Sequence, residues 1–93
     1  MNVSDQYLKK QEIVSLSSLT PGQQGIIVEV GGHPKLRHRL LEMGLVRGET
    51  ISVERVAPLG DPVEFTVKGY HLSLRRRDAT HIQVQPNQPR QRK

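Results

Sequence analysis

The fold is decided by Arg39-Leu40-Leu41-Glu42-Met43-Gly44-Leu45-Val46-Arg47-Gly48-Glu49, where one hydrophobic period gives way to another. After Gly48, Ile51 and Val53 alternate with polar residues, which is typical of a β-strand. Before Gly44 the apolar side chains recur at helical spacing and gather on one stripe; they are Leu36, Leu40, Leu41 and Met43. The stretch therefore predicts a short helix that feeds a strand through a corner built on two glycines.

The helix is expected over residues 34–43. Pro34 suits its first turn, where the missing N–H is not needed, and Gly44 suits the left-handed residue just past its end. A helix of about ten residues is not stable alone, so its apolar stripe must pack on the rest of the domain. We expect Leu36, Leu40 and Met43 to form this contact and Leu41 to lie on its flank, partly exposed.

Outward from the corner, five runs with strand character are separated by turn signals. In the run before the helix, Ile26, Val28 and Val30 are expected to face inward. In the run after the corner, the alternation slips near Arg55 and Val56, which predicts a β-bulge. The five runs are residues 25–30, 50–57, 63–68, 72–75 and 82–84, with one helical turn at 76–79.

These elements predict a mainly β fold, a small SH3-like five-stranded barrel with one short inserted helix; a β-sandwich is the alternative. Ninety-three residues allow one small domain. We place an N-terminal extension at 1–14, the barrel domain at 15–85 and a basic C-terminal tail at 86–93. The tail is expected to be disordered because it has no apolar residue.

Composition excludes several classes of protein. The chain has no cysteine, so it has neither disulfides, nor thiolate zinc sites, nor a cysteine nucleophile. No apolar run approaches the roughly 20 residues that span a bilayer, and residues 1–10 lack the apolar core of a signal peptide. We therefore expect a soluble intracellular protein.

The net charge of +5 suggests nucleic-acid binding, but the excess positive charge lies mainly outside the patterned region. Without the two ends, residues 15–86 carry only +2. A protein that neutralises a row of phosphates concentrates basic residues on its folded face. Only three aromatic residues are available for stacking on bases. Charge and composition together argue against nucleic acid as the main partner.

No catalytic motif is present, and we expect no enzyme and no resident cofactor. Four histidines raise the question of a transition metal, and the best candidate ligands are His38 and Glu42, four residues apart on one helical face. Such a pair would hold Fe²⁺ or a similar ion weakly, and a solvated helix face is the favoured interpretation. The run Arg75-Arg76-Arg77 either grips a phosphate or an acidic surface, or is a solvated strand end beside Asp78.

Specific segments carry a resemblance to a known family. They resemble the ferrous iron transport protein A (FeoA) family over about residues 15–85. The segments are Leu19-Thr20-Pro21-Gly22, Arg39-Leu40-Leu41-Glu42-Met43-Gly44-Leu45-Val46-Arg47-Gly48, Arg55-Val56-Ala57-Pro58-Leu59-Gly60-Asp61-Pro62, and Leu72-Ser73-Leu74-Arg75-Arg76-Arg77-Asp78-Ala79 with Ile82-Gln83-Val84.

The resemblance implies a non-enzymatic accessory protein of bacterial ferrous iron uptake, which binds and modulates the membrane GTPase transporter FeoB. It implies a cytoplasmic location, at the inner membrane only through the transporter. We expect the contact surface on the helix and its corner, at Arg37, Leu40, Leu41, Met43 and Leu45, although each apolar residue there is also a candidate for the core. The alternatives are a small basic nucleic-acid-binding or metal-responsive regulatory module.

Overall fold

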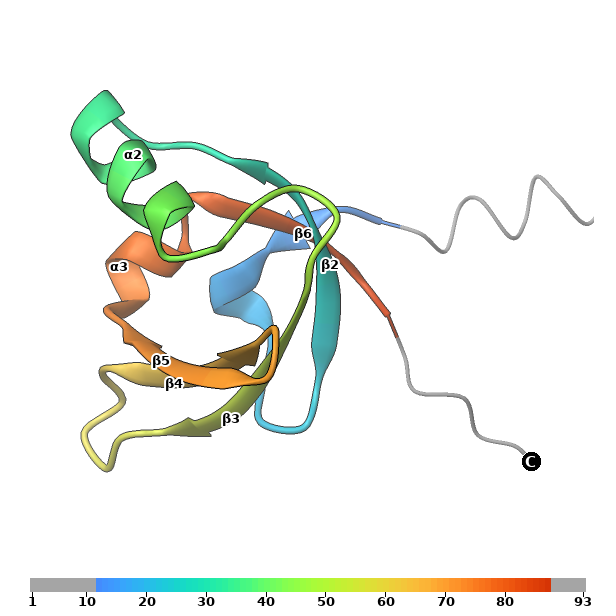
Figure 1. The fold of residues 1–93 in the computed structure, drawn as a ribbon. Coiled ribbons are helices and arrows are strands. Elements are labelled where there is room, and N and C mark those ends of the chain that lie inside the picture. Colours follow the sequence, from blue (N-terminus) through green and yellow to red (C-terminus); the bar gives the residue numbers. More distant parts are fainter. Residues whose placement is uncertain (1–11, 88–93) are drawn as a thin grey trace, which may run out of the picture.

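One antiparallel sheet of six strands, in the order β1-β6-β2-β3-β4-β5, organises residues 12–87, the part of the chain that the computed structural model describes. The strands are β1 (Val14–Ser15), β2 (Gln24–Val30), β3 (Thr50–Val56), β4 (Val63–Val67), β5 (Tyr70–Leu74) and β6 (Ile82–Pro86). A 3-10 turn, η1 (Leu16–Ser18), and two helices, α2 (Pro34–Glu42) and α3 (Arg76–Ala79), join them. The sheet curls around the core, with α2 and α3 at one end (Figure 1).

The mainly β fold with one inserted helix is confirmed, but the structure has six strands and not five. The additional strand is β1, which pairs with β6 through Val14↔Val84 and Ser15↔Gln83. Two residues are too few to show an alternating pattern, so the sequence contains no signal for it. Val14 and Pro86 thus lie in strands, one residue beyond each end of the expected domain. Residues 1–11 of the extension and 88–93 of the expected disordered tail lie outside the described residues.

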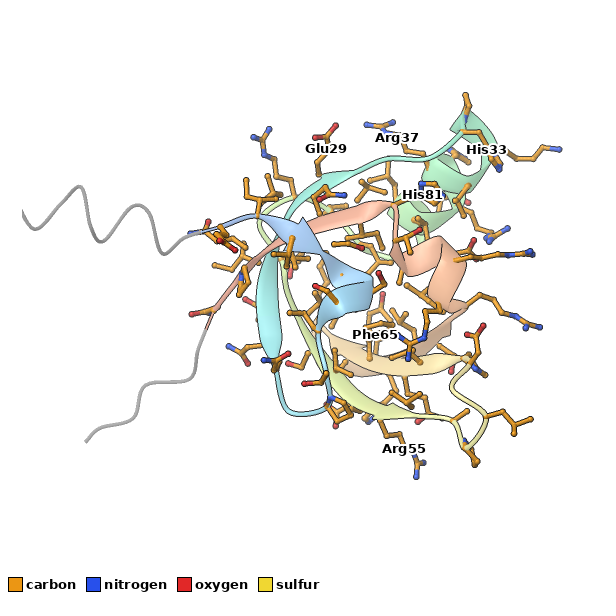
Figure 2. All side chains as sticks on the ribbon, turned by 180° about the vertical axis from the view of Figure 1, so that it is seen from behind. Glu29, His33, Arg37, Arg55, Phe65 and His81 are labelled. Atoms are coloured by element: carbon orange, nitrogen blue, oxygen red, sulfur yellow. The ribbon has the colours of Figure 1, made fainter. Side chains whose placement is uncertain are left out.

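One core fills the inside of the curled sheet. It is formed by aliphatic side chains from every strand except β1, together with side chains of η1, α2 and α3. Phe65 of β4, the largest fully buried side chain, lies inside the barrel (Figure 2). Burying each such side chain contributes roughly 1.5–3 kcal/mol. The buried set is Leu16, Leu19, Ile27, Val30, Leu36, Leu40, Leu45, Ile51, Val53, Val63, Phe65, Val67, Leu74, Ala79, Ile82 and Val84.

The inward face of β2 differs from the expectation. Ile27 and Val30 are buried, whereas Ile26 and Val28 are only half-buried. The cause is a register shift against β6 between Ile27 and Glu29, because an extra residue reverses the alternation of the strand beyond it. In the sequence, three consecutive apolar residues, Ile26-Ile27-Val28, precede Glu29, and such a run is compatible with either phase.

The bulge in β3 is confirmed one residue earlier than its sequence signal. The register against β4 shifts between Val53 and Arg55, so Glu54 is the extra residue and Val56 is left half-buried. Beside the bulge, Arg55 Nε donates to Glu64 Oε1 at 2.9 Å. This hydrogen bond and the neighbouring carboxylate charge raise the pKa of Arg55 above its ordinary value.

The glycine corner between α2 and β3 forms as expected. His33 caps the start of α2, where its Nδ1 accepts from Leu36 N at 3.3 Å. Gly44 has φ +92° and Gly48 has φ +93°, both in the left-handed region that favours glycine. Gly48 N donates to Ile27 O at 2.8 Å, which ties the corner to β2. Within residues 12–87, no helix is both long and apolar enough to cross a bilayer.

Candidate functional site

The five residues expected on the contact surface divide between the core and the outer face of α2. Leu40 and Leu45 have no exposed area, since both are packed into the core. The expectation for these two is therefore corrected: their side chains hold α2 and its corner onto the barrel and are not available to a partner. Leu41 and Met43 are half-buried at the edge of the core and Arg37 is exposed, so these three remain accessible.

A surface hollow of about 320 Å³, which we call the α2–β2 hollow, lies between the outer face of α2 and strand β2. Val28 and Leu41 are its half-buried apolar side chains. Arg37 is fixed at its rim because its Nε donates to Val30 O at 3.1 Å. Arg37 and Glu29 lie along the same edge of the molecule in Figure 2. The full lining is Val28, Glu29, Val30, Arg37, Leu41 and Arg47.

The charge of this hollow is predominantly positive. Arg37 and Arg47 outnumber the one carboxylate, Glu29, and no ion pair within 4.0 Å joins either arginine to an acidic group of residues 12–87. Two cations beside an apolar patch suit a segment that offers an apolar side chain next to a carboxylate. Sequence reasoning found Arg37 and Leu41 from the helix, but it missed Val28 and Arg47. The β2 bulge and the corner after α2 bring these two residues into the same hollow as Arg37 and Leu41.

The candidate metal ligands, His38 and Glu42, do lie together on α2. His38 Nε2 and Glu42 Oε2 are 3.1 Å apart, and their side chains are 75% and 68% exposed. Among the described residues, no group of three or more His, Cys, Asp or Glu side chains is placed to hold a metal ion. Two ligands on an open helix face do not fix the position of a transition metal, which takes at least three protein ligands in typical zinc sites.

The other three histidines have local roles or lie at the ends of elements. His33 caps α2. His71 Nδ1 lies 3.2 Å from Thr66 Oγ1 across the β4–β5 pair. His81 directly precedes β6, and its carbonyl accepts from Gly31 N at 2.7 Å. His33 and His81 both line a second hollow, between α2 and α3.

The three arginines at 75–77 have three different environments. Arg76 is structural: its backbone N–H donates to Asp61 Oδ1 at 2.8 Å, its Nε to Gly60 O at 3.1 Å and a terminal nitrogen to Ser17 O at 3.3 Å. Asp61 therefore caps α3 from the β3–β4 turn, a role that sequence reasoning missed because the two residues are fifteen positions apart. Arg75 is exposed, and Arg77 lines the hollow between α2 and α3.

Comparison with known proteins gives one consistent result. The family model described as FeoA domain matches residues 14–86. A Fe(2+) transport protein A/Fe(2+) transporter FeoB fusion protein of Porphyromonas gingivalis is 50% identical over 70 residues, which make up 75% of this chain. The same match covers 8% of the fusion protein, so the chain corresponds to a small part of that relative.

Solved structures agree on the fold. The solution structure of the FeoA protein from Chlorobium tepidum is 42% identical with a TM-score of 0.73, covering 77% of this chain and 69% of that one. A zinc complex of Stenotrophomonas maltophilia FeoA, described as a prokaryotic SH3 domain protein, has a TM-score of 0.64 at 24% identity, covering 76% and 88%. At that identity the likeness concerns the fold alone, and it confirms the SH3-like prediction.

Proposed function

This chain belongs to the FeoA family, and from that premise we propose that it is a non-enzymatic accessory protein of bacterial ferrous iron uptake. In this proposal it acts in the cytoplasm, binds the cytoplasmic part of the membrane GTPase transporter FeoB, and modulates transport. Iron is the cargo of the transporter and not a resident ion of this chain. The small barrel has open surface hollows on either side of α2, which supports a binding role, since neither of these two is deep and apolar like an ordinary small-molecule site.

The observation that carries the proposal is the fusion relative. In the Porphyromonas gingivalis protein, a segment 50% identical to this chain belongs to the same polypeptide as an FeoB transporter. A covalent connection holds two partners at high effective concentration. An FeoA domain can contact such a partner only through its surface, so the proposal requires a docking site on the barrel.

The α2–β2 hollow is the docking site in this proposal. Leu41 and Val28 supply apolar area, and Arg37 and Arg47 supply two charges that no acidic group of residues 12–87 pairs within 4.0 Å. The complementary surface of FeoB would present an apolar side chain flanked by acidic residues. Buried apolar contact would give affinity, and the rim charges would set orientation and association rate.

The test is capture of the purified cytoplasmic part of FeoB by the full chain, with and without guanine nucleotides. Leu41→Asp should weaken capture at least about tenfold, which corresponds to about 1.4 kcal/mol, because it places a like charge against an acidic partner surface. Leu59→Asp is the matched control, since Leu59 is 97% exposed in the β3–β4 turn. Folding of both variants is checked by circular dichroism and thermal unfolding. Equal capture by the two folded variants would remove the α2–β2 hollow as the docking site, and no capture by the wild type would refute the partnership.

A further inference from the structure

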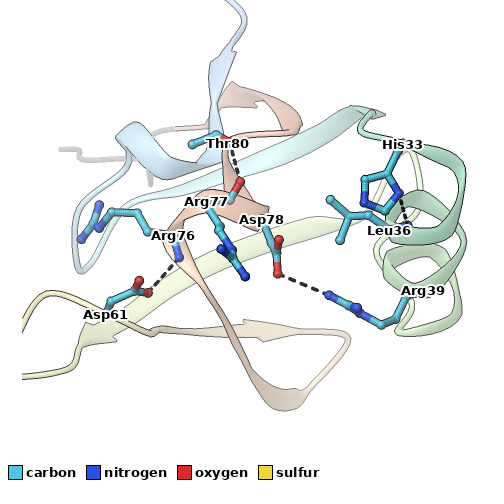
Figure 3. Close-up of polar contacts among 8 residues, drawn as sticks. All are labelled: His33, Leu36, Arg39, Asp61, Arg76, Arg77, Asp78 and Thr80. Atoms are coloured by element: carbon cyan, nitrogen blue, oxygen red, sulfur yellow. Dashed lines mark hydrogen bonds and ion pairs between the residues drawn. The ribbon is translucent and has the colours of Figure 1, made fainter.

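The second hollow, between α2 and α3, collects basic side chains that the proposed FeoB contact does not use. Its volume is about 340 Å³, and we call it the α2–α3 hollow. Arg77 of α3 and Arg39 of α2 approach it on either side of Asp78, and His33 faces the same gap from the start of α2 (Figure 3). The full lining is His33, Lys35, Leu36, Arg39, Arg77, Asp78 and His81.

The positive charge in this hollow exceeds what its one carboxylate can neutralise. Asp78 Oδ2 lies 3.3 Å from Arg39 Nη2, and the aspartate side chain is only 18% exposed. No acidic group among residues 12–87 lies within ion-pair distance of Lys35 or Arg77. Apart from the two histidines, three cations and one anion line this hollow and leave an excess of two positive charges.

We propose that the α2–α3 hollow binds a phosphate group. A phosphate dianion matches the excess charge, and its oxygens can accept from the arginine N–H fork and the lysine ammonium at the same time. Asp78 opposes the phosphate: it pairs with Arg39 at the edge of the hollow, between the two helices, and offsets part of the positive charge. Lys35 and Arg77 are the cations that contact the phosphate directly.

The arrangement around α3 explains why only one of the three consecutive arginines takes part. Arg76 is engaged with Asp61, Gly60 and Ser17, so its guanidinium is directed away from α2. Thr80 Oγ1 donates to Arg77 O at 2.6 Å and closes the end of this short helix. Arg75 precedes the helix and does not line the hollow. It is therefore a matched control: the same residue type, two positions from Arg77.

The test is titration of the full chain, labelled with ¹⁵N, with inorganic phosphate at constant ionic strength set by sodium chloride. The proposal predicts saturable shifts of backbone N–H signals in 33–39 and 76–81. Arg77→Gln and Lys35→Gln should each weaken phosphate binding about tenfold, whereas Arg75→Gln should leave it unchanged within about twofold. Asp78→Asn should tighten binding, since it removes the one negative charge of the hollow.

The source of the phosphate is distinguished by a parallel titration with adenosine 5′-monophosphate. Affinity equal to that of inorganic phosphate would indicate recognition of the phosphate alone, and tighter binding would indicate a nucleotide; both results support a phosphate site. The proposal is overturned if the shifts do not saturate, or if Arg75→Gln weakens binding as much as Arg77→Gln, because either result means non-specific attraction to a basic protein. Well-dispersed spectra of each variant before phosphate is added exclude misfolding.

Discussion

Two separate constraints, its backbone conformation and a close neighbour, disfavour a side chain at Gly44. Its φ of +92° already penalises any side chain. A Cβ at this position would also lie 2.7 Å from the hydroxyl oxygen of Tyr70, which donates to Met43 O and joins β5 to the end of α2. Gly48, four residues on, has almost the same φ, but a Cβ there would meet no atom within 4 Å. Comparing substitutions at Gly44 and Gly48 therefore separates the cost of a positive φ from the cost of a steric conflict.

Gly44→Ala should therefore lower the free energy of unfolding more than Gly48→Ala. Gly48→Ala should cost about 1–2 kcal/mol from the left-handed conformation alone. Gly44→Ala should cost this amount and, in addition, the loss of the Tyr70 contact. Urea unfolding of both variants, each also made with Tyr70→Phe, measures the difference. Equal stability of the two alanine variants in the Tyr70 background would show that the tyrosine causes no steric conflict.

Asp61 is expected to stabilise α3, although it lies in a distant turn. Its carboxylate accepts from Arg76 N at 2.8 Å, and Arg75, the residue at the N-cap position, provides no side-chain cap. Asp61→Ala should lower stability by about 1 kcal/mol, as loss of a helix cap does. Asp61→Asn keeps an accepting oxygen and should recover most of that loss. Denaturant unfolding gives both values, and equal stability of the two variants would show that the cap is unimportant.

At the scale of the elements, α2 has two faces with different tasks. Leu36 and Leu40 point into the core, with 5% and 0% exposure, whereas Leu41 borders the α2–β2 hollow. The helix is too short to be stable in isolation. Its position therefore depends on the buried leucines, and its outer face is available for recognition.

Leu40→Ala and Leu41→Ala should separate these tasks. Leu40→Ala removes a fully buried side chain and should cost about 2–5 kcal/mol of stability. Leu41→Ala should cost clearly less, since Leu41 is only half-buried, but should weaken capture of FeoB. Thermal unfolding and the capture assay are measured on the same preparations. A larger stability loss for Leu41→Ala than for Leu40→Ala would contradict the assignment of the faces.

Sequence reasoning succeeded where a signal was local. The extent of α2, the glycine corner and the β3 bulge all follow from residues within a few positions of one another. It failed where the determining partner is distant. The phase of β2 depends on its register with β6, and the two-residue strand β1 exists only through the same partner. Asp61 and the α2–α3 hollow likewise depend on segments that meet only in the folded chain.

For the whole molecule, the two hollows lie on different sides of α2 and share no lining residue. Each is built from its own strand or helix opposite α2: β2 for one and α3 for the other. The two surfaces should therefore act independently, unless a ligand shifts α2 itself.

To test whether the two hollows act independently, each variant is measured in the assay designed for the other hollow. Leu41→Asp should leave phosphate affinity unchanged within about twofold, and Arg77→Gln should leave FeoB capture unchanged, because additivity holds for separated sites without shared partners. Both variants keep the core, since neither side chain belongs to the buried set. Loss of FeoB capture in Arg77→Gln would show that the two hollows form one continuous recognition surface.

The pairing of β1 with β6 has a consequence for how this barrel can be joined to other proteins. Because the two strands are antiparallel neighbours, the chain enters and leaves the described region at the same end, away from α2, as both ribbon views show (Figures 1 and 2). A domain attached through either connection would be tethered at the end of the barrel opposite α2. Such a tether leaves α2 at the far end of the barrel from the attached domain. A fusion through either connection thus leaves α2 accessible.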